Sequence, residues 1–368
     1  MKVLLFDSSG FHEHNNVLCC EFNTGCFAKE LYDLGNEVIL YGQTIGKGDS
    51  VHTFDLVKNG LKVVSYERKN NKFLNYIYLY YKLIPWIKKS DFVYIYYPNS
   101  FKYATILCKI FHKKYGIYIR GMKGVENKFS RWIYKNAFTI FTVSNYFTDF
   151  VNRVVGREIA NTIRPMIPYT NNDIEYGRVY DLKKKSFNIL FLARVSSDKG
   201  VNELLEAAKI LHVKGYSFHI TFVGDGEYME ETLSLIDKLD IRNIIDVRGA
   251  VYDNNLKRKC FLDSDIYVLP TYHEGFPRTL YEAMIFGTPI VTTFVGGIPS
   301  LMKDGYNCKG MEPRSVQSLI ENLEFAMENY SSMVEYAKEG FNTIERIVDS
   351  KRLTHAEHLN TILRNERK

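Results

Sequence analysis

The segment of the sequence best suited to chemistry covers residues 271–284 and reads TYHEGFPRTLYEAM. Glu274 stands in its first half, and Glu282 follows eight residues later. Pro277 suits the first position of a helix, where its missing N–H would have no partner in any case. A helix that begins there turns its first amides and its positive dipole end towards the loop, and both attract anionic oxygens. The amides concerned are those of Arg278, Thr279 and Leu280.

The two glutamates of this segment have two interpretations. Taken alone, Glu274 or Glu282 could be an acidic residue that merely stabilises a helix start. Taken with the amides beside it, the carboxylate of Glu282 suits two vicinal hydroxyls, such as those of a ribose. Gly275 would let the backbone approach a ligand closely. We therefore expect a ligand site here.

Two further segments carry weaker signals. In residues 191–200, Arg194 and Lys199 lie five residues apart behind an apolar run. Two cations at the carboxyl end of a strand could clamp a diphosphate, although they could equally be solvated loop charges. In residues 223–226 the sequence Val-Gly-Asp-Gly predicts a tight turn at Gly224 and nothing more.

The elements that must position these residues follow from strict alternation of apolar runs and helical patterns in the second half of the chain. This alternation predicts a doubly wound parallel sheet, in which ligands bind beyond the carboxyl ends of the strands. Strands are expected at 187–193, 218–223, 244–247, 266–269 and 289–293. Helices are expected at 200–213, 228–239, 254–262 and 278–286, then at 315–330 and in the tail to about residue 364.

The first half of the chain has the same alternating character. Its expected strands are 2–6, 37–41, 92–97, 117–120 and 139–143, and its expected helices are 27–34, 71–89 and 103–114. The polar stretch 169–185 is interpreted as a linker between two α/β domains. We predict an N-terminal domain at 1–172, a C-terminal domain at 173–345 and a final helix at 346–368 that packs back towards the first domain. The ligand is expected between the two sheets.

These motifs together resemble the retaining glycosyltransferases of family 4, which have the GT-B fold. The resemblance rests on Ala-Arg-x4-Lys-Gly (193–200), Val-Gly-Asp-Gly (223–226), Arg-Gly-Ala (248–250), Leu-Pro-Thr (269–271) and Glu-x7-Glu (274–282). It is specific over roughly residues 187–310 and only topological before them. It implies two Rossmann-like domains that face a central cleft.

The resemblance also implies roles for individual residues. Arg194 and Lys199 would hold the donor diphosphate, and Glu282 the ribose hydroxyls. Glu274 would hold hydroxyls of the transferred sugar, so that Arg194, Lys199 and Glu274 form the catalytic set. The remaining donor-binding residues would be Gly224, Arg248, Gly249, Gly275, Phe276, Pro277, Arg278, Thr279 and Leu280.

The sequence departs from the family pattern at three positions. Ala193 replaces the usual glycine before Arg194, and Ser8-Ser9-Gly10 stands where a glycine pair is common. Arg120 occupies the region in which many members carry a histidine. We expect the acceptor-side residues to be Gly10, His12, His14 and Arg120, with the two histidines in the loop after the first strand.

The implied function is transfer of a hexose-type sugar from a nucleotide diphosphate sugar to an acceptor hydroxyl, without a metal and without a resident cofactor. Asp263 and Asp265 form a D-x-D pair, but they stand between a helix and a buried strand, so we favour no metal there. Alternatives are another GT-B enzyme, such as a nucleotide-sugar epimerase or a phosphorylase, and a dinucleotide-dependent oxidoreductase. The last class would carry G-x-G-x-x-G after a first strand, which is missing here.

Composition and charge bear on partners. The chain has 368 residues, 46% of them hydrophobic, and a net charge of +6. Residues 51–150 contain 17 Lys and Arg against 5 Asp and Glu, interleaved with 13 tyrosines. Such a region favours an anionic partner, and the aromatic-rich stretch 73–89 favours a membrane surface over nucleic acid, although a buried helix explains that stretch equally well. Six scattered cysteines favour a reducing cytoplasm, and no apolar run is long enough for a transmembrane helix. With the basic region and the implied function, we expect a cytoplasmic protein, peripheral on the inner face of the cell membrane, with a lipid-linked or glycan acceptor.

Overall fold

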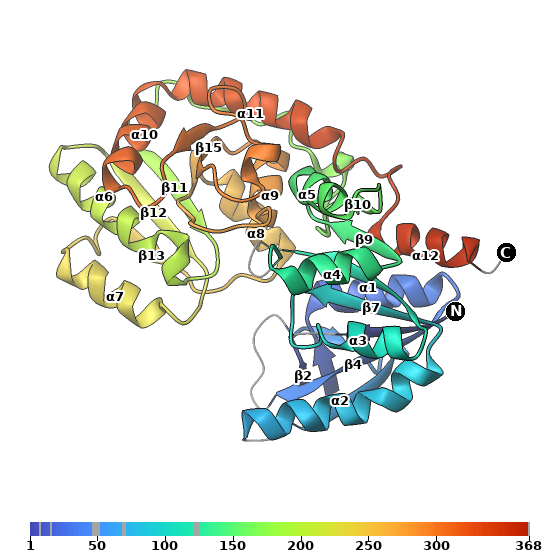
Figure 1. Ribbon diagram of the computed structural model, residues 1–368. Coiled ribbons are helices and arrows are strands. Elements are labelled where there is room, and N and C mark those ends of the chain that lie inside the picture. Colours follow the sequence, from blue (N-terminus) through green and yellow to red (C-terminus); the bar gives the residue numbers. More distant parts are fainter. Residues whose placement is uncertain (7–8, 15–16, 46–51, 68–70, 121–124, 367–368) are drawn as a thin grey trace. The chain divides into compact units, whose positions relative to one another are not determined.

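The computed structural model describes the chain except for residues 7–8, 15–16, 46–51, 68–70, 121–124 and 367–368. By packing, the chain divides into two compact units, each described here by itself (Figure 1). Unit 1 comprises Met1–Met166 and Arg352–Lys368, and unit 2 comprises Ile167–Lys351. Residues 167–172, which were expected in the first domain, pack within unit 2. In the part of the chain that the structure describes, no helix combines the length and apolar character needed to cross a membrane.

Unit 1 is built on one sheet whose described strands follow the order β10-β9-β8-β7-β1-β4-β2-β3-β5, with β6 also paired to β4. The strands are β1 (Lys2–Phe6), β2 (Phe11–His14), β3 (Val17–Cys20), β4 (Glu37–Ile45), β5 (Phe54–Asp55), β6 (Lys62–Glu67), β7 (Phe92–Tyr97), β8 (Lys114–Ile119), β9 (Thr139–Thr142) and β10 (Ala160–Thr162). The helices are α1 (Phe22–Asp33), α2 (Lys72–Lys89), α3 (Ala104–Ile110), α4 (Lys128–Asn136), α5 (Asn145–Val155) and α12 (His355–Asn365). The expected strands 2–6 and 92–97 are confirmed to the residue.

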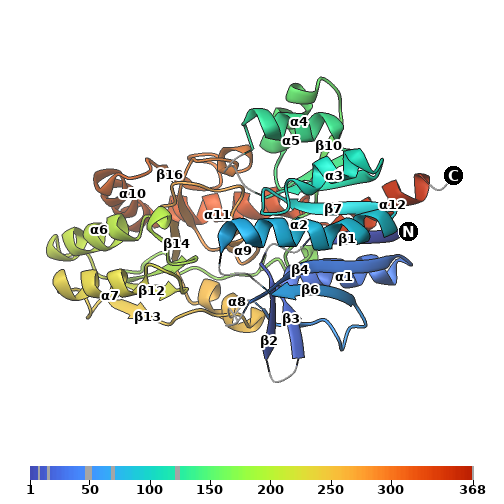
Figure 2. The same ribbon diagram turned by 60° about the horizontal axis from the view of Figure 1, so that its bottom comes forward.

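Both faces of this sheet are covered, which explains why its central strands are apolar throughout. One core joins the sheet to buried residues of α2, α3, α4 and α5, and the other joins it to α1 and α12. All six residues of β7 are buried. In Figure 2, α2 lies across the sheet with α3 beside it, and the two helices contact each other.

One expectation for unit 1 is wrong. His12 and His14 do not lie in a loop but on β2, which pairs antiparallel with β3 and parallel with β4. The segment FHEH contains one apolar residue and three polar or charged ones, so it has little strand signal of its own. The apolar residues of the hairpin lie in the partner strand, VLCC. Pairing with a distant strand, rather than local propensity, therefore makes this segment extended.

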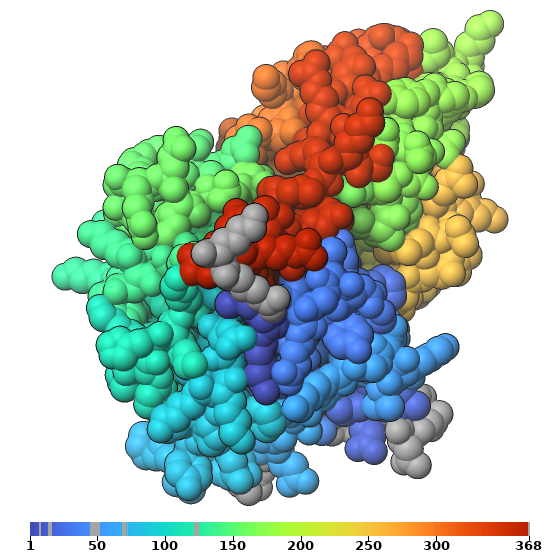
Figure 3. Space-filling model, turned by 90° about the vertical axis from the view of Figure 1, so that its right-hand side faces the viewer, coloured from blue at the N-terminus to red at the C-terminus, as the bar shows by residue number. Residues whose placement is uncertain are grey.

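The C-terminal helix α12 packs in unit 1, against α1 (Figure 3). A capping box of Thr354 and Glu357 starts the helix. The next residue, His355, is buried among aromatic rings, 4.4 Å between centroids from Phe27 and 4.6 Å from Tyr118. The hydroxyl of Tyr94 and Nε2 of His355 share a hydrogen bond at 2.5 Å. Burial lowers the pKa of His355 well below its ordinary value, so the folded protein holds this ring neutral.

This buried ring predicts a pH dependence of stability. An unfolded chain binds a proton at His355 below pH about 6.5 while the folded chain does not, so the stability that this group contributes is lost as pH falls. The free energy of unfolding of the wild type should fall by up to about 1.4 kcal/mol more per pH unit, between pH 6.5 and 5.5, than that of His355→Gln. Urea titrations of both at several pH values measure this. His112→Gln, at an exposed histidine, is the control and should keep the wild-type slope. Equal slopes for wild type and His355→Gln would contradict the assignment.

Unit 2 has a parallel sheet in the order β13-β12-β11-β14-β15-β16. Its strands are β11 (Phe187–Leu192), β12 (Phe218–Val223), β13 (Ile245–Val247), β14 (Ile266–Leu269), β15 (Ile290–Thr293) and β16 (Lys309–Met311). Its helices are α6 (Val201–Val213), α7 (Met229–Lys238), α8 (Asn254–Leu262), α9 (Arg278–Ile285), α10 (Val316–Glu328) and α11 (Tyr330–Glu345). One core packs α6, α7 and α10 on the sheet, the other packs α8 and α9, and α11 contributes to both.

The stretch 169–185 is not a free linker, which corrects the expectation. Tyr169 and Ile174 are buried in unit 2. The guanidinium of Arg178 donates to the carbonyls of Phe286 at 2.8 Å and Ser264 at 2.5 Å, among others. The polar composition of this stretch hides two buried apolar residues and one half-buried cation, which is why it resembles a linker in sequence.

Candidate functional site

The topology of unit 2 brings the three candidate segments together. Strand β11 lies between β12 and β14, and all three are parallel. Arg194 follows β11, Gly224 follows β12, and the segment with Glu274 follows β14. Their carboxyl ends therefore meet at one edge of the sheet, as expected for a ligand site in this class of sheet.

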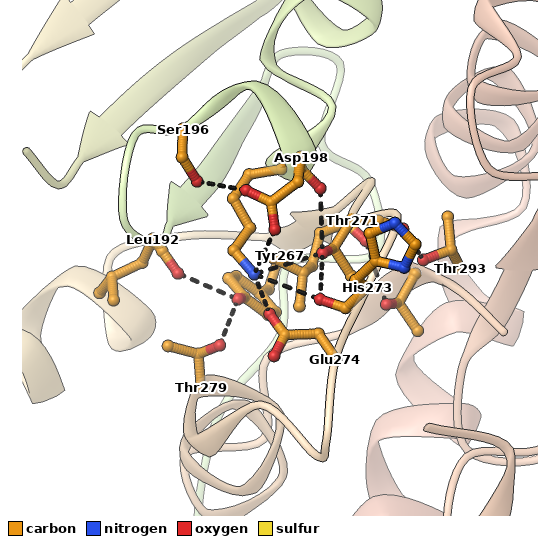
Figure 4. A network of polar contacts seen from close by, with 12 residues as sticks. Leu192, Ser196, Asp198, Tyr267, Thr271, His273, Glu274, Thr279 and Thr293 are labelled. Atoms are coloured by element: carbon orange, nitrogen blue, oxygen red, sulfur yellow. Dashed lines mark hydrogen bonds and ion pairs between the residues drawn. The ribbon is translucent and has the colours of Figure 1, made fainter. Parts of the chain in front are cut away.

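The ammonium of Lys199 lies at the centre of a network of polar contacts, whose members Asp198, Thr271, His273 and Glu274 are labelled in Figure 4. Its ammonium donates to the carboxylate of Glu274 and lies 3.7 Å from Asp198. It also lies 3.4 Å from the hydroxyl of Thr271 and 3.5 Å from the carbonyl of His273. The side chain is only 10% exposed. Lys199 and Glu274, which the sequence assigned to different parts of the ligand, are therefore direct partners.

The pKa values of the two acids in this network are shifted in opposite directions. Burial raises the pKa of Glu274, although Lys199 partly offsets the shift. Burial would also raise the pKa of Asp198, but the hydrogen bond from Ser196 and the charge of Lys199 together lower it. Arg194 is exposed and acts on both carboxylates as a nearby charge. The result is a buried ion pair, Lys199–Glu274, with a further cation beside it in solvent.

The loop that carries Glu274 is held by its backbone. The hydroxyl of Thr293 donates to the carbonyl of Thr271 at 2.6 Å, and the amide of Tyr272 donates to the carbonyl of Asp198 at 2.8 Å. Gly296 has φ +58°, and a Cβ there would stand 1.9 Å from the carbonyl oxygen of Glu274. Only glycine lets this neighbouring turn approach the loop so closely.

Glu282 lies in the second turn of α9 and is 5% exposed. Its Oε1 is 3.8 Å from the ammonium of Lys257 on α8. Burial raises the pKa of Glu282, while Lys257 and Arg278 act in the opposite direction. A carboxylate so deeply placed, with one distant cation as its described ion-pair partner, costs folding energy and is more readily explained by a ligand than by helix stabilisation.

The helix start is close to the expected one. Pro277 is the N-cap of α9, and Arg278 is the first helical residue. Of the three amides expected to bind an anion, that of Leu280 instead donates to the carbonyl of Pro277 at 3.1 Å within the first turn. Those of Arg278 and Thr279 are too early in the helix to have partners within it. They are the amides that can bind an anion.

A hydrogen-bond chain ties this helix start to the sheet. The hydroxyl of Thr279 lies 2.6 Å from that of Tyr267 on β14, which donates to the carbonyl of Leu192 at 3.1 Å (Figure 4). The ring of Phe276 is buried and packs on Tyr281 with 4.4 Å between centroids. Gly275 is buried as well. The loop and the first turn of α9 are thus fixed before any ligand binds.

The remaining donor-side residues lie at the ends of β12 and β13. The amide of Gly224 donates to the carbonyl of Gly249 at 2.8 Å, which joins the two turns. Arg248 donates to the carbonyl of Phe222 through its amide at 2.9 Å and pairs with Asp246 at 2.6 Å through its side chain. Because β12 is next to β11, these turns border the segment with Arg194.

The four acceptor-side residues all lie in unit 1. Gly10 is buried with φ +86°, and Arg120 follows β8 with its guanidinium 4.7 Å from the centre of the Tyr96 ring. His12 is opposite Cys19 and His14 opposite Val17 in the hairpin of β2 and β3. Gly10 and Arg120 follow strands that both flank β7, whereas the histidines lie beyond β4.

The D-x-D pair has a structural explanation. The carboxylate of Asp265 lies 2.7 Å from the ammonium of Lys184 and accepts the amide of Asn188 at 2.7 Å. It therefore tethers residues 184–188 to the start of β14. Within the described ranges, no group of three or more His, Cys, Asp or Glu side chains is arranged as metal ligands.

Several residues of the network could not be singled out from the sequence. Asp198 and Tyr267 carry no motif of their own, although Asp198 is next to Lys199. Thr271 ends the Leu-Pro-Thr motif, but no role was expected for it. Two residues separate Gly296 from the predicted strand 289–293, and the Gly-Gly pair at 296–297 is the signal that could have located it. Lys257 lies on another helix and has no detectable signal.

Comparison with solved structures defines the class of fold. A crystal structure of Anabaena Alr3699/HepE in complex with UDP and glucose aligns over 100% of this chain and 99% of its own, with a TM-score of 0.71 and 18% identity. The apo form of the lipopolysaccharide outer core galactosyltransferase WaaB aligns over 100% of both chains, with a TM-score of 0.66 and 18% identity. The chain has the GT-B fold, as the motifs implied.

Sequence comparison gives the family. Residues 173–343 match the family model described as glycosyl transferases group 1. This part of the chain is therefore similar to that family, as the resemblance implied. Similar relatives are the amylovoran biosynthesis glycosyltransferase AmsK of Erwinia amylovora, 31% identical over 34% of this chain and 32% of its own, and the capsular polysaccharide biosynthesis glycosyltransferase CapM of Staphylococcus aureus, 25% identical over 49% and 47%. The match spans less than half of the length of these curated relatives.

Proposed function

We propose that the chain is a retaining, metal-independent glycosyltransferase of family 4 that moves a hexose from a nucleotide diphosphate sugar to an acceptor hydroxyl. One observation carries the proposal: the partly buried carboxylate of Glu274 and the buried carboxylate of Glu282 lie on either side of the start of α9 in the sequence, with Lys199 paired to Glu274 and Arg194 nearby. Sugar hydroxyls and a diphosphate are the ligand groups that satisfy all of these at once. Because the structurally similar HepE was crystallised in complex with UDP and glucose, a uridine donor is the first to test.

Each group then has one task. Glu282 accepts hydrogen bonds from the two ribose hydroxyls, and Glu274 from hydroxyls of the transferred sugar. Arg194, Lys199 and the amides of Arg278 and Thr279 stabilise the negative charge that develops on the diphosphate as its bond to the sugar breaks. The acceptor oxygen forms the new bond on the same face, and its proton passes to an oxygen of the leaving phosphate.

The biological setting is proposed from the relatives. Their names refer to amylovoran and capsular polysaccharide biosynthesis, and we propose that this chain also builds a surface polysaccharide, on a lipid-linked or glycan acceptor. We place it in the cytoplasm, on the inner face of the cell membrane. An epimerase would instead convert a nucleotide sugar with no acceptor present, so product analysis without acceptor separates the two enzymes.

The donor assignment predicts a split between binding and stability at Glu282. Calorimetric titration with UDP-glucose, or with the donor found in a screen, should show Glu282→Ala weakened by roughly 1–3 kcal/mol, or about 5- to 150-fold in Kd, because ribose hydroxyls lose their acceptor. The affinity should be the same in EDTA as in magnesium.

Replacing Glu282 should not lower thermal stability as it lowers donor affinity. Because burial raises the pKa of Glu282, its ionised form costs folding energy at pH 7.5. Glu282→Gln should therefore unfold at the wild-type temperature or above it. Glu231→Ala, at an exposed position on α7, is the control for both measurements. Unchanged donor affinity in Glu282→Ala would contradict the ribose assignment.

A further inference from the structure

Three neighbouring helices of unit 1, α2, α3 and α4, contain no acidic residue. They lie on the same face of the sheet, where they share one core. Contacts run from one to the next: Tyr80 packs edge-on against Tyr103 at the start of α3, and Tyr103 packs on Phe129 of α4. We call the outer surface of these helices the helical face. It is defined by the exposed residues of the next two paragraphs.

Large apolar side chains are exposed along two of these helices. On α2 they follow the spacing of one helix side, with Phe73 73% and Tyr81 70% exposed and Leu74 and Ile77 between them. On the adjacent α3 segment the exposed residues are Tyr103, Ile106 and Ile110, again on one side. The buried side of α2 is a different one, formed by Leu79, Leu83 and Ile87. The aromatic-rich stretch is therefore amphipathic, and core packing does not account for its outer residues.

Cations line the same face. The exposed ones are Lys82, Lys88, Lys89, Lys109, Lys128, Arg131 and Lys135. On α4 the exposed cations recur at 128, 131 and 135, along one side of the helix. Among the residues that the structure describes, none of these seven pairs with a carboxylate; Lys88 instead lies 4.7 Å from the centre of the Phe111 ring, and Lys109 5.3 Å from that of Trp132. The face thus keeps its positive charge.

We propose that the helical face docks in the plane of an anionic membrane surface. Lysine and arginine attract anionic headgroups, while exposed Tyr, Phe and Ile gain free energy by entering the interface below them. A nucleic acid would use the cations but would leave Ile77, Ile106 and Ile110 in water. A second copy of the chain would set two positive faces against each other. Only a surface that is apolar beneath an anionic layer matches both sets of residues.

This inference deepens the proposed function, because a membrane-bound face places the protein where a lipid-linked acceptor lies. The binding itself requires no transfer reaction. It can therefore be tested apart from catalysis, and failure of either one is distinguishable from failure of the other.

The test is co-sedimentation of the full chain with vesicles of phosphatidylcholine, with and without 30% phosphatidylglycerol. We expect pelleting with the anionic vesicles at low salt, little pelleting with the neutral ones, and a tenfold or greater loss of binding when the salt is raised to about 0.5 M. A residual salt-resistant fraction should remain, owing to the apolar residues. Failure to pellet with anionic vesicles at low salt would overturn the proposal.

Matched variants separate the contributions. Lys82→Glu/Lys88→Glu/Lys89→Glu should lower the partition coefficient by about a hundredfold or more. Phe73→Ser/Ile77→Ser/Tyr81→Ser should abolish the salt-resistant fraction. The control, Lys183→Glu/Lys185→Glu/Lys238→Glu, makes the same charge change on exposed lysines of unit 2 and should bind as wild type. All three should keep wild-type donor affinity.

Equal loss of binding in the control variant would mean that net charge alone drives the binding, and it would overturn the site. Two other results would assign the face to another partner. Light scattering that shows a dimer, abolished by the Phe73/Ile77/Tyr81 variant while vesicle binding is unaffected, would assign the face to a second copy. Competition by RNA that removes the protein from anionic vesicles while the apolar variant binds as wild type would assign it to nucleic acid.

Discussion

Replacing Arg178 with methionine should lower the free energy of unfolding of unit 2 by about 3 kcal/mol or more, which corresponds to roughly 6–12 °C in Tm. The guanidinium donates to the carbonyls of Phe261 and Leu262 at the end of α8 and to that of Phe286 after α9. It also donates to Ser264 and to the hydroxyl of Thr288. Methionine fills a similar volume but takes the guanidinium donors away from these groups, although the carbonyl of Phe261 still accepts from the hydroxyl of Thr288 at 2.9 Å.

The position of Arg178 makes this one of the largest effects expected. A cation at two helix C-termini also opposes the negative ends of both helix dipoles. Burial lowers the pKa of Arg178, which shows how much the desolvated guanidinium depends on its partners. Scanning calorimetry measures the change. Arg242→Met is the matched control, because Arg242 forms an exposed pair with Asp237 and should cost under about 1 kcal/mol. Similar values for the two variants would contradict the capping role.

Replacing Lys199 with alanine should lower turnover by about 10²- to 10³-fold. Its ammonium is buried and already oriented by Glu274, Asp198 and Thr271, so it can oppose the charge that grows on the leaving diphosphate without reorganising. Affinity for the nucleoside monophosphate should change much less, because that ligand lacks the second phosphate.

The two readouts distinguish catalysis from structure. If Lys199 served only to neutralise Glu274, Lys199→Ala would lower monophosphate affinity and Tm along with turnover. Lys214→Ala, at an exposed lysine paired with Glu324, controls for a lysine lost from a surface ion pair. Equal losses in turnover and in monophosphate affinity would mean that Lys199 stabilises the bound ground state and the transition state equally. That result would contradict its proposed role in the transition state.

The elements around the donor site are the part of the fold that the sequence predicts best. Strands β12 and β14 and the start of α9 appear where they were expected, because each is a short apolar run or an amphipathic turn bounded by Gly or Pro. The pairing of Lys199 with Glu274 follows from strand order, since both stand at carboxyl ends of neighbouring strands.

Other features could not be predicted, for identifiable reasons. The β2–β3 hairpin depends on pairing with β4, which a local pattern does not reveal. Arg178 resembles a solvated linker cation because its carbonyl partners lie up to 108 residues away. Lys257 contacts Glu282 across two helices. In each case the deciding contact is distant in sequence and carries no periodic signal.

The central claim is that unit 2 binds the nucleoside diphosphate part of a sugar donor. It is tested most directly by a thermal-shift screen of nucleoside mono- and diphosphates, nucleotide sugars and NAD against the wild type and Glu282→Ala. We predict that one nucleoside diphosphate and its sugar raise the Tm of the wild type, by about 5–10 °C at a hundred times Kd. The matching monophosphate should shift it less, Glu282→Ala should lose most of the shift, and NAD should give none. No shift with any diphosphate at millimolar concentration, or a shift with NAD, would contradict the claim.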